Sequence, residues 1–177
     1  MKKYLPNVLE REFGEIDASM NSILSRKVQI IKYQGKDGLS FISTLGLSNM
    51  DNNDNKFEWI MEFEQDFPSE QAASMMDYFL KKLVDTKLFP PKRGSYISFP
   101  KESDHIWSND NLCGIYFTYP FYRSKKFDDS LSEIDIVPVW VVPITKFEKD
   151  ILENEGWTHL ENYWNIQNIN LHNPYRS

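Results

Sequence analysis

Four carboxylates that lie close together in the sequence are of a type that acid–base or metal chemistry uses. Asp128, Asp129, Glu133 and Asp135 fall within one short segment, and divalent cations such as Mg²⁺ and Ca²⁺ prefer carboxylate oxygens as ligands. One hypothesis is therefore a metal-dependent hydrolase that uses Asp128, Asp129 and Glu133. The alternative is a solvated loop that leads into a strand, and we favour this alternative.

Other residues with catalytic potential are sparse. The three histidines, His105, His159 and His172, have no metal-ligand spacing relative to one another or to the one cysteine. Cys113 lies in an apolar segment with few basic neighbours, which predicts a small buried hydrophobe and not a nucleophile. The sequence has no glycine-rich phosphate loop and no nucleophile elbow. We therefore expect no catalytic residue, no metal and no cofactor, and we expect that the protein is not an enzyme.

Negative charge is concentrated in one segment of the chain. The 177 residues carry a formal net charge of -6. Residues 51–70 hold seven acids and one base, which leaves 19 residues of each sign in the other 157. An acidic chain without a basic cluster repels nucleic acid, so we expect no nucleic-acid partner.

The acidic segment has two interpretations. It can be the wet face of a strand followed by the start of a helix, or it can be a binding surface for a basic protein, whose association the acids would accelerate. In the second case Asp51, Asp54 and Glu58 are the predicted partner-binding residues. Aromatic side chains would reach the rim as anchors if the strand lies at an edge. These aromatic residues are Phe57, Trp59, Phe63 and Phe67.

The composition is that of one folded domain, which we assign to residues 1–177. Hydrophobic residues make up 41% and aromatic residues 15%, enough for a substantial core. The N-terminus has two lysines, but Glu10, Arg11 and Glu12 follow where a secretion signal would be apolar. No stretch of 18 apolar residues occurs. We expect a cytoplasmic protein without a membrane partner.

Period-two and helical patterns predict the secondary structure. The predicted strands are residues 27–33, 39–47, 56–63, 95–100, 112–120 and 132–145. The predicted helices are residues 6–13, 68–89 and 145–155, with a further short helix over 157–164. The turn residues of "GKDG" predict a hairpin between the first two strands. Helices and strands do not alternate as βαβ units, so we predict an α+β domain with a mixed, largely antiparallel sheet and helices packed on it.

Three local features define element ends. Pro138 cannot donate a hydrogen bond to a sheet, so the strand over 132–145 must have a bulge or a free edge there. Thr145 and Glu148 form the pattern of a capping box at the start of a helix. In "STLGLSNM", Gly46 permits a close backbone approach, and Ser48 can satisfy backbone groups where strand pairing stops. This motif therefore indicates architecture and not a site.

Three segments resemble one known family. "EREFGEI", "TLGLSNM" and "VPVWVVPITKFEKDILENEGWTHL" occur in the order seen in bacterial suppressor-of-fused domains. The resemblance extends from about Arg11 to Leu160 and is loose over residues 85–130. It implies a mixed α/β sandwich that acts by binding proteins. It transfers no catalytic residue, and it assigns no binding residue position by position.

The resemblance also implies a function. Eukaryotic relatives bind transcription factors, and bacterial relatives are mostly immunity proteins that neutralise toxins. We therefore expect an immunity protein, or antitoxin, that binds a cognate toxin such as a basic nuclease and occludes it. A regulatory scaffold for an endogenous protein and the metal-dependent hydrolase are the alternatives. The oligomeric state is left open by the sequence.

Overall fold

The computed structural model describes residues 5–50, 56–85, 91–99, 111–120 and 123–176. In chain order the elements are α1 (Leu5–Phe13), β1 (Ile16–Asn21), β2 (Gln29–Lys36), β3 (Leu39–Leu45), a 3-10 turn η1 (Leu47–Asn49), β4 (Phe57–Glu64), α2 (Ser69–Asp85), β5 (Tyr96–Ser98), β6 (Leu112–Thr118), α3 (Lys125–Ser132), β7 (Val137–Thr145), α4 (Lys146–Glu155) and α5 (Trp157–Ile166). None of these helices is both long and apolar enough to cross a membrane.

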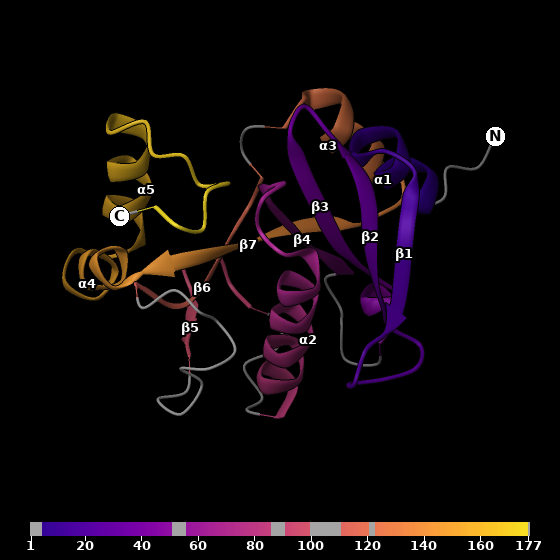
Figure 1. The fold of residues 1–177 in the computed structure, drawn as a ribbon, viewed down its shortest axis with the longest axis horizontal. Coiled ribbons are helices and arrows are strands. Elements are labelled where there is room, and N and C mark those ends of the chain that lie inside the picture. Colours follow the sequence, from indigo (N-terminus) through magenta and orange to yellow (C-terminus); the bar gives the residue numbers. More distant parts are fainter. Residues whose placement is uncertain (1–4, 51–55, 86–90, 100–110, 121–122, 177) are drawn as a thin grey trace.

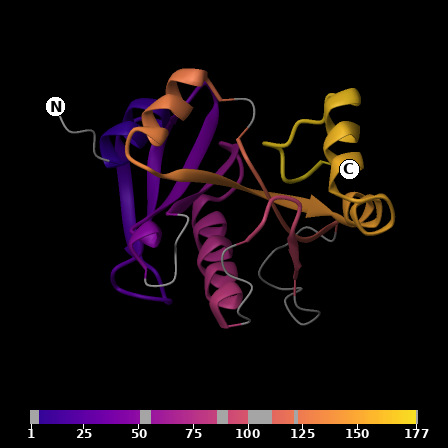
Figure 2. The ribbon, with the colours of Figure 1, turned by 180° about the vertical axis from the view of Figure 1, so that it is seen from behind.

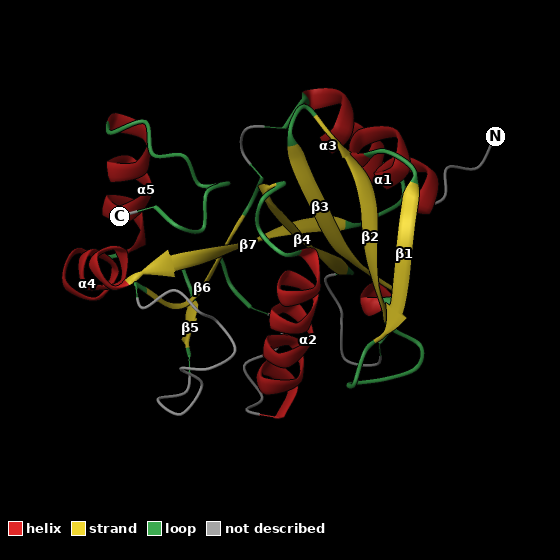
Figure 3. Cartoon of the chain, in the orientation of Figure 1, coloured by secondary structure: helices red, strands yellow, loops and turns green. Residues whose placement is uncertain are grey.

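The strands form one sheet in the order β1-β2-β3-β4-β7-β6-β5 (Figure 3). Every neighbouring pair is antiparallel except β4 and β7, which are parallel. This confirms the prediction of an α+β fold with a mixed, largely antiparallel sheet. The "GKDG" segment makes the predicted hairpin between β2 and β3.

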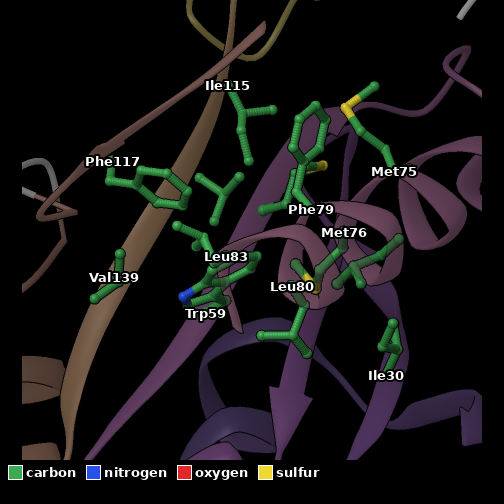
Figure 4. Packing of buried hydrophobic residues seen from close by; sticks show 14 of the residues in the cluster. Ile30, Trp59, Met75, Met76, Phe79, Leu80, Leu83, Ile115, Phe117 and Val139 are labelled. Carbon is green, nitrogen blue, oxygen red and sulfur yellow. The ribbon is translucent and has the colours of Figure 1, made fainter. Parts of the chain in front are cut away.

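One face of the sheet is covered by a single helix and the other by four helices within the described residues. One face packs against α2, and the other packs against α1 and α3 at one end and against α4 and α5 at the other end (Figures 1 and 2). On the α2 face, Trp59 of β4 and Val139 of β7 lie under Leu80 and its neighbours on the helix (Figure 4). The helical spacing of apolar residues in α2 thus predicted the face that the helix buries.

β4 lies in the middle of the sheet, which corrects two expectations. Neither a wet face nor an edge is present, because α2 covers one face and α1 and α3 cover the other. The four aromatic side chains between positions 57 and 67 are therefore buried and cannot anchor a partner at the rim of an interface. Ile60 packs with the residues of α1 and α3, and Glu58 and Glu62 are buried on the same face. A strand in which apolar and acidic residues alternate can therefore be buried on both faces, because the protein supplies hydrogen-bond partners for the acids.

Two elements were absent from the sequence prediction. β1 has the sequence "IDASMN", in which all six residues are exposed, so it carries no apolar alternation. The segment of α3 has the polar pattern of a loop, but Ser124 caps a helix there by accepting a hydrogen bond from the backbone nitrogen of Phe127. Phe127 and Leu131 then bury one side of the helix against α1. Asp128 and Asp129 are thus helical residues.

The two prolines of β7 lie where the strand has one neighbour. β7 pairs with β4 up to Trp140 and with β6 from Trp140 onward. Within the described residues, β4 is the only strand that pairs with Pro138, and β6 is the only strand that pairs with Pro143. This confirms the expected free edge at Pro138.

A buried ion pair ties the C-terminal segment to α4. Thr145 and Glu148 form the predicted capping box. The Glu148 carboxylate also accepts two hydrogen bonds from Arg176, both of 2.9 Å, and one of 2.8 Å from the indole of Trp164. Arg176 also donates hydrogen bonds to the carbonyl of Pro143 at 2.6 Å and to that of Asn173 at 3.1 Å. The capping carboxylate therefore holds β7, α4, α5 and the chain end together.

Candidate protein-binding surface

The predicted partner-binding residues do not form a described surface. Glu58 is 1% exposed, so its carboxylate is not available to a partner, and this part of the prediction is corrected. The carboxylate accepts hydrogen bonds from the Thr44 hydroxyl at 2.7 Å and from the backbone nitrogens of Gly46, Leu47 and Ser48. Burial raises the pKa of Glu58, and the hydrogen bonds from Thr44, Ser48 and Gly46 oppose this rise. Asp51 and Asp54 lie outside the described residues.

Glu62 also has a structural role. Its side chain is buried, and Arg123 donates two hydrogen bonds to it from the start of the α3 region. Arg123 also contacts Glu12 at 3.3 Å, and its guanidinium lies 5.1 Å from the ring centre of Phe13. His172 approaches the same carboxylate at 3.5 Å. These contacts join α1, β4, α3 and the C-terminal segment.

The carboxylates of the hydrolase hypothesis do not converge. Asp128 and Asp129 lie on α3 and are exposed, and Glu133 is its C-terminal cap. Asp135 forms an ion pair with Lys56 at 2.7 Å. Across the part of the chain that the structure describes, no three His, Cys, Asp or Glu side chains are arranged to hold a metal ion.

The described histidines and the cysteine occupy ordinary positions. His159 at the surface of α5 lies 3.1 Å from the carboxylate of Glu155, the last residue of α4, and His105 lies outside the described residues. Cys113 is half-buried, its thiol donates to the carbonyl of Ile144, and burial raises the thiol pKa to about 11. A thiol of this pKa is protonated at neutral pH and is a weak nucleophile.

A hollow forms where β6 leaves β7. The pairing of these strands ends at Thr118 and Trp140, and the chain beyond β6 turns away as Tyr119 and Pro120. Within the described residues no strand pairs with the free side of β7 there, and Val137 is exposed. The hollow is lined by Tyr119, Pro120, Asp128, Ser132, Ile136, Val137 and Pro138. Its lining is mainly apolar, with the carboxylate of Asp128 and the hydroxyls of Tyr119 and Ser132.

Tyr119 of the hollow lining is one of two exposed aromatic rings that share a contact with Arg93, and the other is Trp157. Tyr119 is 46% exposed and Trp157, the first residue of α5, is 39% exposed. The Arg93 guanidinium lies 4.8 Å from the ring centre of Trp157 and 5.8 Å from that of Tyr119, within the range of cation–π attraction. We call the rings, together with the hollow lining defined above, the Tyr119 surface.

A partly buried carboxylate, that of Glu161, holds the Arg93 guanidinium between the two rings. Glu161 accepts hydrogen bonds from Arg93, from the Tyr116 hydroxyl at 2.8 Å and from the Thr118 hydroxyl at 2.7 Å. The hydrogen bonds with Glu161 raise the pKa of Arg93. The phenol pKa of Tyr116 is raised by burial and then by Glu161. The side chains under the rings are therefore held in one arrangement before any partner arrives.

Gly94 provides the space that Trp157 needs. A Cβ atom at Gly94 would lie 2.5 Å from the indole ring, and the φ angle of +85° is one that favours glycine. The loop before β5 and the start of α5 are thus fitted to each other. This arrangement is suited to binding a polypeptide, because exposed and preordered aromatic residues are typical anchors of protein interfaces.

Sequence reasoning did not find this surface. Arg93, Tyr119, Asp128 and Trp157 come from four separate segments, and no pairwise spacing joins them. The available signal was a tryptophan directly after Gly156, the predicted helix stop. A large aromatic residue at the first position of an outer helix is well placed for exposure.

The comparisons with known proteins define the class of fold. The chain is similar to the crystal structure of a chain described as a suppressor of fused homologue from Neisseria gonorrhoeae FA 1090, with a TM-score of 0.69 and 12% identity. The alignment covers 97% of this chain and 92% of that chain. The fold is therefore that of a suppressor-of-fused-like α+β domain. No curated protein matches the chain.

The family follows from the sequence comparison. The model of the suppressor of fused protein (SUFU) family matches residues 25–177, which include all of the sheet except β1. The protein belongs to the SUFU family. This agrees with the resemblance carried by "TLGLSNM" and by the segment from β7 to α5.

Proposed function

We propose that this protein is an immunity protein that binds a cognate toxin and blocks it by occlusion, without catalysis of its own. The observation that carries the proposal is the Tyr119 surface. Its exposed Tyr119 and Trp157 rings are held by Arg93 beside a mainly apolar hollow. Preordered anchors of this kind lose little conformational entropy on binding.

Electrostatics support a basic toxin, such as a nuclease. The net charge of the chain is -6, and Asp51 and Asp54 precede β4 in the acidic segment. Asp128 contributes a carboxylate to the hollow itself. A basic partner would be drawn to this protein at long range, and the aromatic anchors would then give the complex its lifetime.

The test is binding to the protein encoded by the adjacent reading frame. We expect a stable complex on co-purification, together with loss of the toxin's activity. Tyr119→Ala and Trp157→Ala should each weaken binding by about tenfold or more, mainly through faster dissociation. Ile23→Ala is the matched control, because Ile23 is 72% exposed but lies in the loop after β1, on another part of the molecule. Equal affinity of all three variants would exclude the Tyr119 surface.

The steering contribution of the acidic segment has its own test. Asp51→Lys combined with Asp54→Lys should slow association by about tenfold at low salt. Asp150→Lys, which reverses an exposed charge on α4, should change it less. Capture of an endogenous protein, with no binding to the neighbouring gene product, would instead support a regulatory scaffold.

A further inference from the structure

β1 presents an open edge of the sheet. It pairs with β2 alone, and within the described residues no other strand lies beside it. All six of its residues are exposed, and Met20 is 40% exposed. An exposed edge strand offers unpaired backbone donors and acceptors to another strand.

The hydrogen bonds between β1 and β2 show which backbone N–H and C=O groups of β1 point away from the sheet. The backbone nitrogen of Ser22 donates to the carbonyl of Val28, so the groups of Ser22 point toward β2. Because this direction alternates along an antiparallel strand, Ser19 and Asn21 direct their N–H and C=O groups away from β2. These are the groups that a new strand would pair with.

A hollow lies beside the small side chain of Ala18. It is lined by Ala18, Ser19, Met20, Ile30, Lys32, Ser69, Glu70, Ala73 and Ser74. Ala18 and Met20 lie on the α2 face, because their partners are Lys32 and Ile30 and because Ile30 packs under α2. The hollow lies between β1 and the first half of α2, and the exposed Met20 is part of its lining.

We propose that two copies of this chain associate by antiparallel pairing of their β1 strands, with Ser19 opposite Ser19 of the second copy. In this register the two Ser19 residues exchange backbone hydrogen bonds across the two-fold axis. Ala18 then faces Met20 of the second copy in a pair whose side chains lie close together. Each Met20 enters the hollow beside Ala18 of the other copy, and the two sheets become continuous.

The charges around β1 of one copy are complementary to those around β1 of the second copy in this two-fold dimer. Glu15 precedes β1, and Arg26 and Lys27 lie in the turn that follows it. All three are exposed, and within the described residues none of the three forms an ion pair. Antiparallel pairing brings the acidic end of one strand toward the basic turn of the other, at separations where screening is incomplete.

The size of the contact sets the expected strength. A bulge between Ile16 and Ala18 limits the regular part of the edge to Ala18–Asn21. Such a short interface belongs to the weak class, so we expect a dissociation constant in the range of about 1–100 µM. The self-association does not depend on the proposed toxin and is measured on the purified chain alone.

The first experiment is sedimentation equilibrium of the full chain over a range of concentrations. We expect the mass to rise from 21.0 kDa toward twice that value. Met20→Glu, which places a carboxylate near Glu70 of the other copy, should raise the dissociation constant at least about tenfold. The control is Ile166→Glu, because Ile166 is an exposed apolar residue at the end of α5. A chain that stays monomeric up to its solubility limit overturns the proposal.

Two further variants test the geometry. Ser19→Pro removes the outward N–H and should weaken the dimer, whereas Ser19→Ala keeps it and should not; circular dichroism checks that both variants fold. Glu15→Lys and the double variant Arg26→Glu/Lys27→Glu should each weaken self-association. An equimolar mixture of these two should restore it as a heterodimer, because opposite charges then meet at both ends. A dimer that is insensitive to Ser19→Pro and Met20→Glu, or no recovery in the mixture, would overturn the assignment to β1.

Discussion

Ser48 donates two hydrogen bonds to the same carboxylate oxygen of Glu58, one from its backbone nitrogen at 3.1 Å and one from its hydroxyl at 2.7 Å. The "STLGLSNM" loop is therefore closed onto β4 by a buried acid. The polar residues after β3 satisfy a carboxylate in the interior, which explains why an acidic residue can lie in the central strand.

Loss of this carboxylate should destabilise the fold. Glu58→Ala leaves the Thr44 hydroxyl and the backbone nitrogens of the loop without their acceptor, at a cost of about 3 kcal/mol or more in the free energy of unfolding. Urea denaturation measures this change. Asp66→Ala, at an exposed acid of the same segment, should change the free energy by no more than about 0.5 kcal/mol. Similar values for the two variants would show that Glu58 does not anchor the loop.

Gly46 and Gly38 form a matched pair for backbone strain and contact. Both have positive φ angles, but a Cβ at Gly46 would lie 2.3 Å from the Lys27 carbonyl oxygen, whereas a Cβ at Gly38 meets nothing within 4 Å. Gly38→Ala should cost about 1–2 kcal/mol from strain alone. Gly46→Ala should cost at least about 2 kcal/mol more, because the two strands must separate. Thermal or urea unfolding of both variants gives the difference, and equal costs would contradict the close approach.

Arg176 should be essential to the stability of the C-terminal segment. Arg176→Ala leaves the Glu148 carboxylate in a buried site without its cation, which costs about 3–5 kcal/mol. Arg176→Lys should restore only part of this, because an ammonium cannot make the two parallel contacts. Chemical denaturation checks both, with the exposed Lys92→Ala as the control. A mild effect of Arg176→Ala would mean that the pair is solvated in solution.

Cys113 should react slowly with alkylating reagents in the folded state. Its pKa of about 11 is above the ordinary value of 9.0, so at pH 8 the thiolate fraction should be about 100-fold lower than for a free thiol. The rate of iodoacetamide labelling, followed by mass spectrometry, measures this, and the same chain in denaturant provides the reference. Fast labelling of the folded protein at pH 8 would contradict burial of the thiol.

The same shift has a consequence for stability at high pH. The folded protein holds the Cys113 proton more tightly than the unfolded chain does. The contribution of Cys113 is therefore fully present below pH 9 and is lost as the pH rises toward 11. Comparison with Cys113→Ala, which does not titrate, isolates this term; parallel pH profiles of the two proteins would exclude it.

The sequence by itself determined the elements whose signals are local. The apolar stripe of α2, the capping box at Thr145 and the hairpin of β2 and β3 each depend on residues a few positions apart, and all are present. The close approach at Gly46 and the free edge at Pro138 were also predictable, since only certain residues tolerate those backbone states.

Tertiary structure alone decided which charges are buried and which aromatic residues are exposed. Glu58 and Glu62 alternate with apolar residues as the acids of a wet face would, but α1 and α3 cover that face, and Arg123 and the loop after β3 supply the partners. Tyr119 and Trp157 are neighbours because Arg93 joins segments that are distant in the chain. The burial of a side chain depends on segments that are distant in the sequence, and a local sequence pattern does not show which of these segments will pack against it.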